Sequence, residues 1–418
     1  MEISFLLPVL VSLVGIYLLF KLRFFFIIHP IKTANRFISA LRERDARRAF
    51  CLALAGTLGV GNIFGVAAGI MIGGAGSVLW LFVSSVFAMV IKYSETLLVF
   101  DNLHAKGGMS AAIPDIFPRL GKLLSPTYAL FTVALALFMG SAMQSTAVID
   151  VADTALALKP EITALILVIL FLPCVFGGAK KIESITEFLI PLTTIIYIII
   201  SFLAIFRNIS ELGTAINLIF SSAFTTDGIL GGAVSSVSFL ALKEGFARGI
   251  LSNEAGVGTS ALAHTRASGR TPNTAGLFGM CEVVFDTSIL CMLTAFVILL
   301  APIDISAYGT PMSLVAAAFT SVLGEWSGYL LLFLIFAFAY STIICWYFYG
   351  YECSRQYFPK FKKIYIVAFP LFIIVSSSLS SGFLLYSIDL ILFFMSLITL
   401  SAIIKKRERI KELSLCDK

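Results

Sequence analysis

Long apolar runs alternate with short polar segments along almost the whole chain. A helix needs about 20 mostly apolar residues to cross a bilayer, and eleven windows approach or exceed this length. They are residues 3–22, 48–72, 76–100, 126–150, 161–178, 184–206, 229–265, 273–301, 326–351, 364–380 and 383–404. The pattern predicts an all-α integral membrane protein with about 11 transmembrane helices in one membrane domain. The composition agrees, because 13% charged residues is about half of what soluble domains carry.

Glycine clusters interrupt two of these windows, at residues 56–65 and 245–258. Non-helical backbone at membrane depth is tolerated where it is buried in protein or lines a polar cavity. Discontinuous helices of this kind typically form the substrate and ion site of a transporter. Part of the signal has a packing explanation, since glycines at 61, 65, 69 and 73 repeat every four residues. The remaining glycines of residues 56–61 favour transport.

The ten windows after the first divide into two sets of five, residues 48–206 and 207–404. Five is an odd number, so the second set is inverted relative to the first, and each set opens with a glycine-broken helix. Such paired interruptions indicate a binding site near the bilayer midplane; the alternative is a chance match in a glycine-rich chain. Residues 1–47 form an extra N-terminal helix and a cytoplasmic amphipathic segment, and residues 405–418 form a cytoplasmic tail.

The basic residues predict the orientation. With the N-terminus outside, most of the 30 Lys and Arg residues fall on the cytoplasmic side, and only Lys159 and Arg207 fall opposite. We therefore expect a multi-pass protein of the cell membrane with a cytoplasmic C-terminus. This bias explains the net charge of +6 without a nucleic-acid partner. Eight basic residues from Lys21 to Arg48, interleaved with Phe, Ile and Leu, are typical of an amphipathic helix on the inner leaflet.

The first interruption is expected to unwind over residues 58–61. Unwinding releases the carbonyls of Ala55 and Leu58, which suit a cation such as sodium, while backbone amides at the start of the second half-helix attract a carboxylate. We expect the substrate to contact the unwound residues Gly59, Val60, Gly61 and Asn62. Capping of the second half-helix is the alternative role of Asn62.

Two further segments carry candidate substrate contacts. Gln144, followed by Ser145, offers two donors and an acceptor to an amino acid, or makes an interhelical hydrogen bond. In the second interruption we predict a substrate-facing break at Gly245 to Gly249. The charged and polar residues around it are expected in the cytoplasmic half, as an inner gate or a structural salt bridge: Arg248, Asn253 and Glu254.

Three polar residues lie within later windows. Ser341 and Thr342 either complete a sodium shell begun by the Ala55 and Leu58 carbonyls or bond back to their own helix. A carboxylate such as Asp286 costs free energy in the middle of a membrane span, so Asp286 is a functional candidate. It is expected to serve as a second cation ligand, a proton carrier or a partner of Arg248.

Other titratable residues point to no chemistry. Lys92 and Glu95 lie three residues apart near an inner helix end, where snorkelling and mutual pairing explain them. Seven cysteines without a Cys-x-x-Cys motif and three scattered histidines predict neither a metal site nor a disulfide framework. No constellation of His, Asp and Ser predicts an enzyme.

Together these segments resemble the alanine/glycine:cation symporter family of amino-acid carriers. The matching motifs are residues 59–63, Lys92-x-x-Glu95, Gln144-Ser145, residues 219–225, residues 247–258, Asp286-Thr287 and residues 341–350. The resemblance implies a leucine-transporter-type fold of five plus five inverted helices with one extra N-terminal helix, and sodium as the coupling ion. It places the substrate carboxylate at the Val60 and Gly61 amides with Gln144. Sodium would bind at the Ala55 and Leu58 carbonyls with Ser341 and Thr342.

Three departures from the family pattern leave the substrate and the transport competence open. Val60 replaces the usual Thr, Glu244 replaces a large apolar residue, and residues 107–110 lack the usual Gly-Gly-Pro-Met-Tyr-Tyr continuation.

The sequence thus predicts a secondary active transporter that imports alanine or glycine with sodium by alternating access. A proton-coupled carrier of another small zwitterion, acting through Asp286 or Glu244, remains open, as does a non-transporting amino-acid receptor. The expected partners are a small amino acid and the lipid bilayer. The oligomeric state stays open, with a monomer allowed.

Overall fold

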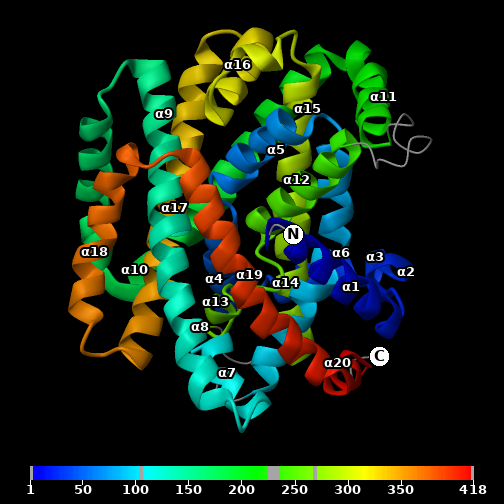
Figure 1. The fold of residues 1–418 in the computed structure, drawn as a ribbon, viewed down its shortest axis with the longest axis vertical. Helices are drawn as coiled ribbons and strands as arrows, with labels where there is room; N and C mark the ends of the chain where they lie inside the picture. The colour runs from blue at the N-terminus through cyan, green and yellow to red at the C-terminus, as the bar shows by residue number, and fades with distance from the viewer. Residues whose placement is uncertain (1–2, 103–106, 225–235, 267–270, 416–418) are drawn as a thin grey trace.

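The computed structural model describes residues 3–102, 107–224, 236–266 and 271–415 of the 418-residue chain. The start of the predicted window at 229, Thr225 of the motif at 219–225, and Lys106, Arg270 and Lys418 lie outside these residues. Every regular element in the described part is a helix (Figure 1). The elements are α1 (Ile3–Lys21), α2 (Phe25–Ile28), α3 (Pro30–Ala40), α4 (Arg44–Thr57), η1 (Gly61–Gly65), α5 (Val66–Gly73), α6 (Ser77–Asp101), α7 (Met109–Ile116), α8 (Gly121–Leu135), η2 (Ala136–Met143), α9 (Gln144–Leu156), α10 (Pro160–Arg207), η3 (Ile209–Glu211), α11 (Leu212–Ala223), α12 (Ser236–Asn253), α13 (Ala261–His264), α14 (Pro272–Val283), η5 (Val284–Cys291), α15 (Met292–Leu300), η6 (Ile305–Ala307), α16 (Pro311–Leu323), α17 (Trp326–Tyr357), α18 (Lys362–Val375), η7 (Ser376–Ser378), α19 (Ser381–Lys405) and α20 (Arg407–Leu415).

By length and composition, six helices in the described part can cross a membrane, or seven when the bent pair of α4 and η1–α5 counts as one span. The difference from eleven windows has physical causes. Helix α10 has 48 residues and covers two windows, which meet at Gly178, where φ is +64°. Helices α1 and α18 are short, and α12 carries several charges, yet each coincides with a predicted window.

The two interrupted helices run in opposite directions through the middle of the molecule. The chain passes from α4 in the lower half of Figure 1 to α5 in the upper half, and from α12 in the upper half to α13 in the lower half. Helix α12 packs against both α5 and η1, so the two interrupted helices touch. This antiparallel arrangement fits an inverted repeat, although the boundaries predicted for the two halves remain a prediction.

The second interruption does not lie where the sequence predicts it. Helix α12 continues through Gly245 and Gly249 and ends at Asn253, and positive φ angles follow at Glu254, Gly256 and Gly258. The predicted break at Gly245 to Gly249 is therefore wrong. These two glycines serve close packing instead, since a Cβ at either would collide with α6, at Ser77 and Ser84 respectively.

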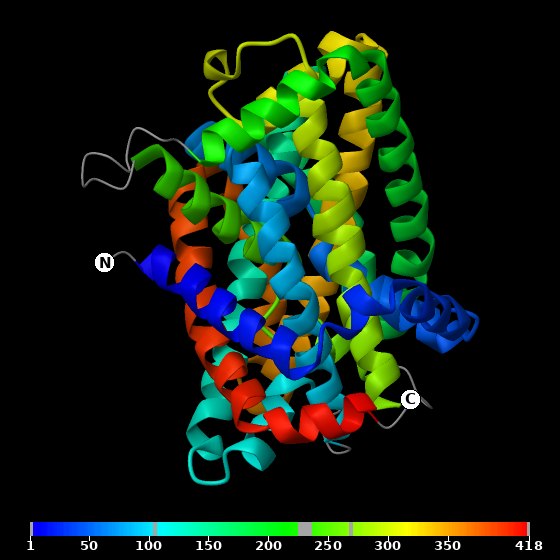
Figure 2. The same cartoon turned by 90° about the vertical axis from the view of Figure 1, so that its right-hand side faces the viewer.

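The N-terminal segment lies against the outside of the bundle. Helix α1 packs on α6, α12 and α19, and α3 packs on α14; Figure 2 shows α1 crossing the bundle obliquely and α3 projecting beside it. On α3 Thr33 and Phe37 are buried, whereas Ile31 and Ile38 are exposed. Helices α3, α7 and α20, which carry predicted cytoplasmic residues, all lie in the lower half of Figure 1.

Candidate substrate and ion site

The first interruption begins where α4 ends at Thr57, as the sequence predicts. Between Arg44–Thr57 and Gly61–Gly73 the helix axis bends by 45°, and the chain resumes as a π-helical turn, η1. A Cβ at Gly59 would lie 2.7 Å from both the Gln144 Oε1 and the Thr342 Oγ1. Only glycine therefore lets these two side chains approach the unwound backbone together.

Helix α17 satisfies carbonyls at the end of α4 that have no partner within the helix. The Thr342 hydroxyl donates to the Ala55 carbonyl at 2.8 Å, and the Trp346 indole donates to the Gly56 carbonyl at 3.1 Å. The structure thus brings together two of the four residues predicted to bind sodium.

The other two predicted sodium ligands are placed differently. The Ser341 hydroxyl donates to the Phe338 carbonyl of its own helix at 2.8 Å, which is the local role that the sequence left open. Leu58 is fully buried at the break, and its amide donates to the Leu54 carbonyl. Their part in ion binding remains a prediction.

Gln144 reaches the first interruption directly. Its Oε1 accepts a hydrogen bond from the Val60 amide at 2.9 Å, and its Nε2 donates to the Met139 carbonyl at 3.1 Å. Met139 lies in the π-helical turn η2, an irregularity frequent at functional sites. Ser145, in contrast, donates to the Ser141 carbonyl of its own helix.

A second polar cluster surrounds the buried carboxylate of Asp286. It accepts hydrogen bonds from the Asn62 Nδ2 at 2.5 Å, the Ser252 hydroxyl at 2.6 Å and the Thr287 hydroxyl at 2.8 Å. The cluster links η1, α12 and η5. Asn62 therefore contacts another helix rather than capping its own. Ser252 was missed as a site residue, although it lies within the family motif at residues 247–258.

Arg248 pairs with acidic residues other than Asp286. Its Nε lies 3.2 Å from Glu244 and its Nη2 lies 3.3 Å from Asp389 of α19. Its aliphatic stem packs on Gly69 of α5. Because the break follows Asn253, Arg248 lies in the α5 half of the molecule, opposite α4 and α13. The pairing that the sequence offered as the structural alternative is present.

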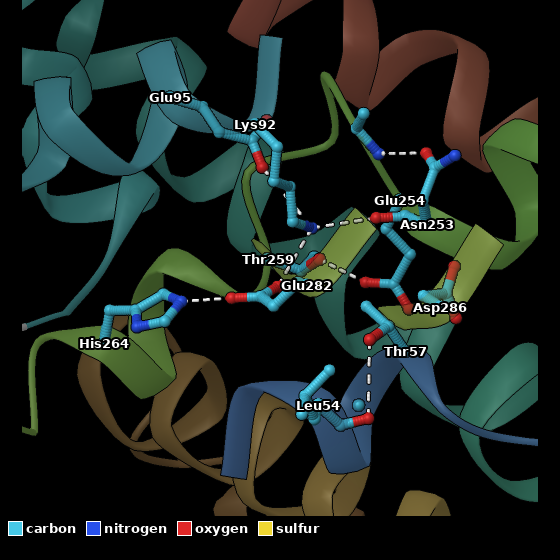
Figure 3. A network of polar contacts seen from close by, with 12 residues as sticks. Leu54, Thr57, Lys92, Glu95, Asn253, Glu254, Thr259, His264, Glu282 and Asp286 are labelled. Carbon is cyan, nitrogen blue, oxygen red and sulfur yellow. Dashed lines mark hydrogen bonds and ion pairs between the residues drawn. The ribbon is translucent and has the colours of Figure 1, made fainter. Parts of the chain in front are cut away.

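Asn253 and Lys92 join α6 to the second interruption. The Lys92 ammonium donates to the Asn253 carbonyl at 2.9 Å (Figure 3). It also lies 3.5 Å from Glu95 and 3.7 Å from Glu282. The predicted pairing of Lys92 with Glu95 is confirmed, but snorkelling is wrong, because both side chains are fully buried.

Further hydrogen bonds hold the unwound residues 254–260. The Glu254 carboxylate accepts from the Thr259 hydroxyl at 2.6 Å, and the Glu95 carboxylate accepts from the Gly256 amide at 2.9 Å. Glu282 contacts His264 of α13 (Figure 3). Glu282 and His264 were missed; an acidic residue within the window 273–301 was the signal.

Comparison with known proteins identifies the family. The family model "Sodium:alanine symporter family" matches residues 1–413. The probable sodium/glutamine symporter GlnT of Bacillus subtilis is 32% identical over 385 residues, which is 87% of this chain and 77% of that protein. The sodium/alanine symporter AgcS of Methanococcus maripaludis is 32% identical, covering 78% of this chain and 73% of that protein.

Solved structures show the fold. MhsT in complex with L-phenylalanine aligns with a TM-score of 0.52 at 15% identity, covering 85% of this chain and 98% of that one. The nucleobase-cation symporter MHP1 aligns with a TM-score of 0.54 at 12% identity, covering 82% and 74%. These likenesses confirm the predicted leucine-transporter-type fold. The chain therefore belongs to the sodium:alanine symporter family, a family of sodium-coupled amino-acid symporters.

Proposed function

We propose that this symporter carries a small neutral amino acid, alanine or glycine, bound at the first interruption. The hydrogen bond from the Val60 amide to Gln144 carries this proposal. An amide at the start of a half-helix is a good donor to a carboxylate. A substrate carboxylate would take the acceptor position of the Gln144 Oε1 and leave the Gln144 amide free to bind the substrate.

The surroundings of this amide favour a small side chain. A crevice beside the break, lined by Phe64, Met143, Thr146, Leu384 and Leu385, is too narrow to admit water. Any substrate side chain that enters this crevice must displace some of these closely packed, mostly apolar side chains, and a larger one must displace more of them. The name of the GlnT relative makes glutamine the natural competitor to test.

We infer that sodium binds where α4 and α17 meet. The Ala55 carbonyl and the Thr342 hydroxyl are 2.8 Å apart, and Ser341 precedes Thr342 on the same helix. Unwound carbonyls together with hydroxyls suit sodium. A sodium ion would take the place of this hydrogen bond and bind both the Ala55 carbonyl oxygen and the Thr342 hydroxyl oxygen. The Ser341 hydroxyl and the Leu58 carbonyl would complete its shell.

Asp286 is the second coupling candidate. Its carboxylate is the one formal charge of its cluster with Asn62, Ser252 and Thr287. It would support a second cation through this charge or carry a proton. Uptake driven by a proton gradient in the absence of sodium, present in the wild type and lost in Asp286→Asn, would assign proton carriage, whereas a loss confined to sodium-driven uptake would assign support of a second cation.

Charged contacts in the two halves fit alternating access. Arg248 links α12 to α19 in the α5 half, and Lys92 links α6 to the end of α12 next to α13. We infer that each group of contacts closes one side of the site and opens in turn. The orientation that assigns the α5 half to the outside rests on the distribution of basic residues.

Uptake of labelled alanine and glycine into proteoliposomes tests the function. We expect accumulation with an inward sodium gradient and none when choline replaces sodium, with excess alanine competing better than glutamine. Gln144→Ala should raise the alanine KM, and Ser341→Ala should raise the sodium requirement. Uptake that is unchanged in choline would contradict sodium coupling, and stronger competition by glutamine would contradict the proposed substrate.

A further inference from the structure

A cavity of about 450 Å³ lies away from the central site, where α1 meets α2 and α3. Helices α6, α14 and α20 complete its walls through Tyr93, Asn273 and Lys411. The Tyr93 hydroxyl donates to the Asn273 side chain at 2.7 Å, which joins α6 and α14 in the wall. None of the lining residues belongs to the proposed substrate or sodium site.

The lining is strongly basic. Its basic residues are Lys21, Arg23, His29, Lys32, Arg36 and Lys411, and no described acidic residue lines the cavity. Lys21 pairs with Glu408 at 2.6 Å. In the described part of the chain, Arg23, Lys32 and Lys411 form no ion pair. Converging positive charges without partners repel one another, so an anion bound among them would be stabilised.

The backbone at the mouth of the cavity is held in an unusual conformation. Arg23 and Phe24 have φ angles of 56° and 51°, in the left-handed region that residues with a side chain rarely adopt. This turn joins α1 to α2, and Lys21, Arg23 and Lys32 on either side of it all line the cavity. Strained residues of this kind persist where the surrounding structure fixes them and cluster at ligand sites.

Apolar side chains lie beside the basic wall. Ile27, Ile28 and Ile31 are 52%, 60% and 76% exposed, and Ile28 lines the cavity itself together with Leu22 and Phe25. A ligand that satisfies both surfaces carries an anionic group and a hydrocarbon part. Free phosphate would leave the isoleucines uncovered, and a zwitterionic amino acid would leave the charges unmatched.

We propose that this cavity binds the phosphate headgroup of an anionic phospholipid, whose acyl chains lie along Ile27, Ile28 and Ile31. Basic pockets between membrane helices on the cytoplasmic side recognise such headgroups. The cavity lies at the end of the bundle where basic residues gather, and α3 has the amphipathic pattern of an interfacial helix. The bound lipid would fasten α3 to α6 and α14, the helices that carry Lys92 and Glu282.

Lipid binding to the purified full-length protein in detergent tests this proposal independently of transport. We expect phosphatidylglycerol to remain bound in native mass spectra and to raise the unfolding temperature, whereas phosphatidylcholine does neither at the same concentration. The double variant Arg23→Gln/Lys32→Gln should weaken phosphatidylglycerol binding about tenfold or more, since each charge contributes to attraction of an anionic lipid. Glutamine keeps the left-handed strain at position 23 unchanged.

Matched variants make the outcome decisive. Lys360→Gln/Lys363→Gln removes two exposed charges, one from the loop after α17 and one from the first turn of α18, and should leave lipid binding unchanged. Ile27→Ser/Ile31→Ser should weaken phosphatidylglycerol binding through the acyl chains. Equal stabilisation by inorganic phosphate would overturn the lipid assignment in favour of a small-anion site. Equal binding of phosphatidylcholine, or an unchanged affinity in Arg23→Gln/Lys32→Gln, would overturn the site itself.

Discussion

The Nη2 of Arg248 lies 3.3 Å from the Oδ2 of Asp389, although 141 residues separate them in the sequence. Both side chains are largely buried, at 5% and 15% exposure. The contact joins α12, which holds the second interruption, to α19 at the far end of the chain.

A double-mutant cycle with Arg248→Gln and Asp389→Asn measures this contact. Removing one partner of a buried pair leaves an uncompensated charge and typically costs about 3–5 kcal/mol. We expect each single variant to lower the unfolding temperature and raise the alanine KM. The double variant should lose less stability than the two single variants lose together. The exposed pair of Arg355 and Glu352 is the control and should show coupling below about 1 kcal/mol. Strictly additive losses would show that Arg248 acts without Asp389.

Gly59→Ala tests the close approach at the first interruption. The new Cβ would lie 2.7 Å from both the Gln144 Oε1 and the Thr342 Oγ1, so both must move. Overpacking typically costs about 1–3 kcal/mol, and we expect sodium-driven uptake to fall roughly tenfold or more. Gly61→Ala is the matched control, because its Cβ would meet nothing nearer than 3.8 Å. Comparable uptake by the two variants would remove Gly59 from the site.

The two interruptions show what glycine can and cannot reveal in a sequence. Residues 56–61 break the helix as predicted. At Gly245 and Gly249 the helix continues, because absence of a Cβ serves packing against α6 there. The glycines with positive φ in the second interruption are Gly256 and Gly258, a closely spaced pair about ten residues further along the sequence. A glycine cluster in a sequence can thus mark either a break in a helix or a close helix contact, and only the tertiary packing distinguishes the two.

Misplacing this break also misplaced the residues around it. The predicted break at residues 245–249 included Arg248, whereas the helix continues past Arg248 and the break follows Asn253. The Arg248 partner Asp389 could not be predicted, since periodicity within a helix carries no information on contacts 141 residues away. The burial of Lys92 was unforeseen for the same reason, because two of its partners, Asn253 and Glu282, come from other helices.

Thr342→Val tests the proposed sodium site. Valine keeps the shape of threonine but removes the hydroxyl that lies 2.8 Å from the Ala55 carbonyl. We expect the sodium concentration for half-maximal uptake to rise about tenfold, because losing one polar contact to a charged group typically costs about 1.5–3 kcal/mol. Thr342→Ser retains the hydroxyl and should behave almost like the wild type. An unchanged sodium response in Thr342→Val would exclude this hydroxyl as a ligand.

Lys92→Met tests the buried network beside the second interruption. The ammonium lies 3.5 Å from Glu95 and 3.7 Å from Glu282, and all three side chains are buried. Its removal leaves buried carboxylates without their shared cation, so we expect a loss of about 3–5 kcal/mol in the free energy of unfolding. Adding Glu95→Gln to Lys92→Met removes one uncompensated charge and retains an acceptor for the Gly256 amide. The double variant should therefore be more stable than Lys92→Met alone.

Denaturant unfolding followed by tryptophan fluorescence measures these differences, with Lys360→Met as the control for an exposed lysine. That control should change the free energy of unfolding by less than about 0.5 kcal/mol. If Glu95→Gln fails to recover stability in the Lys92→Met background, the lysine acts chiefly through its 2.9 Å hydrogen bond to the Asn253 carbonyl. In that case the cost comes from a buried carbonyl left without a donor at the end of α12 rather than from unbalanced carboxylates, and the electrostatic account of the network is wrong.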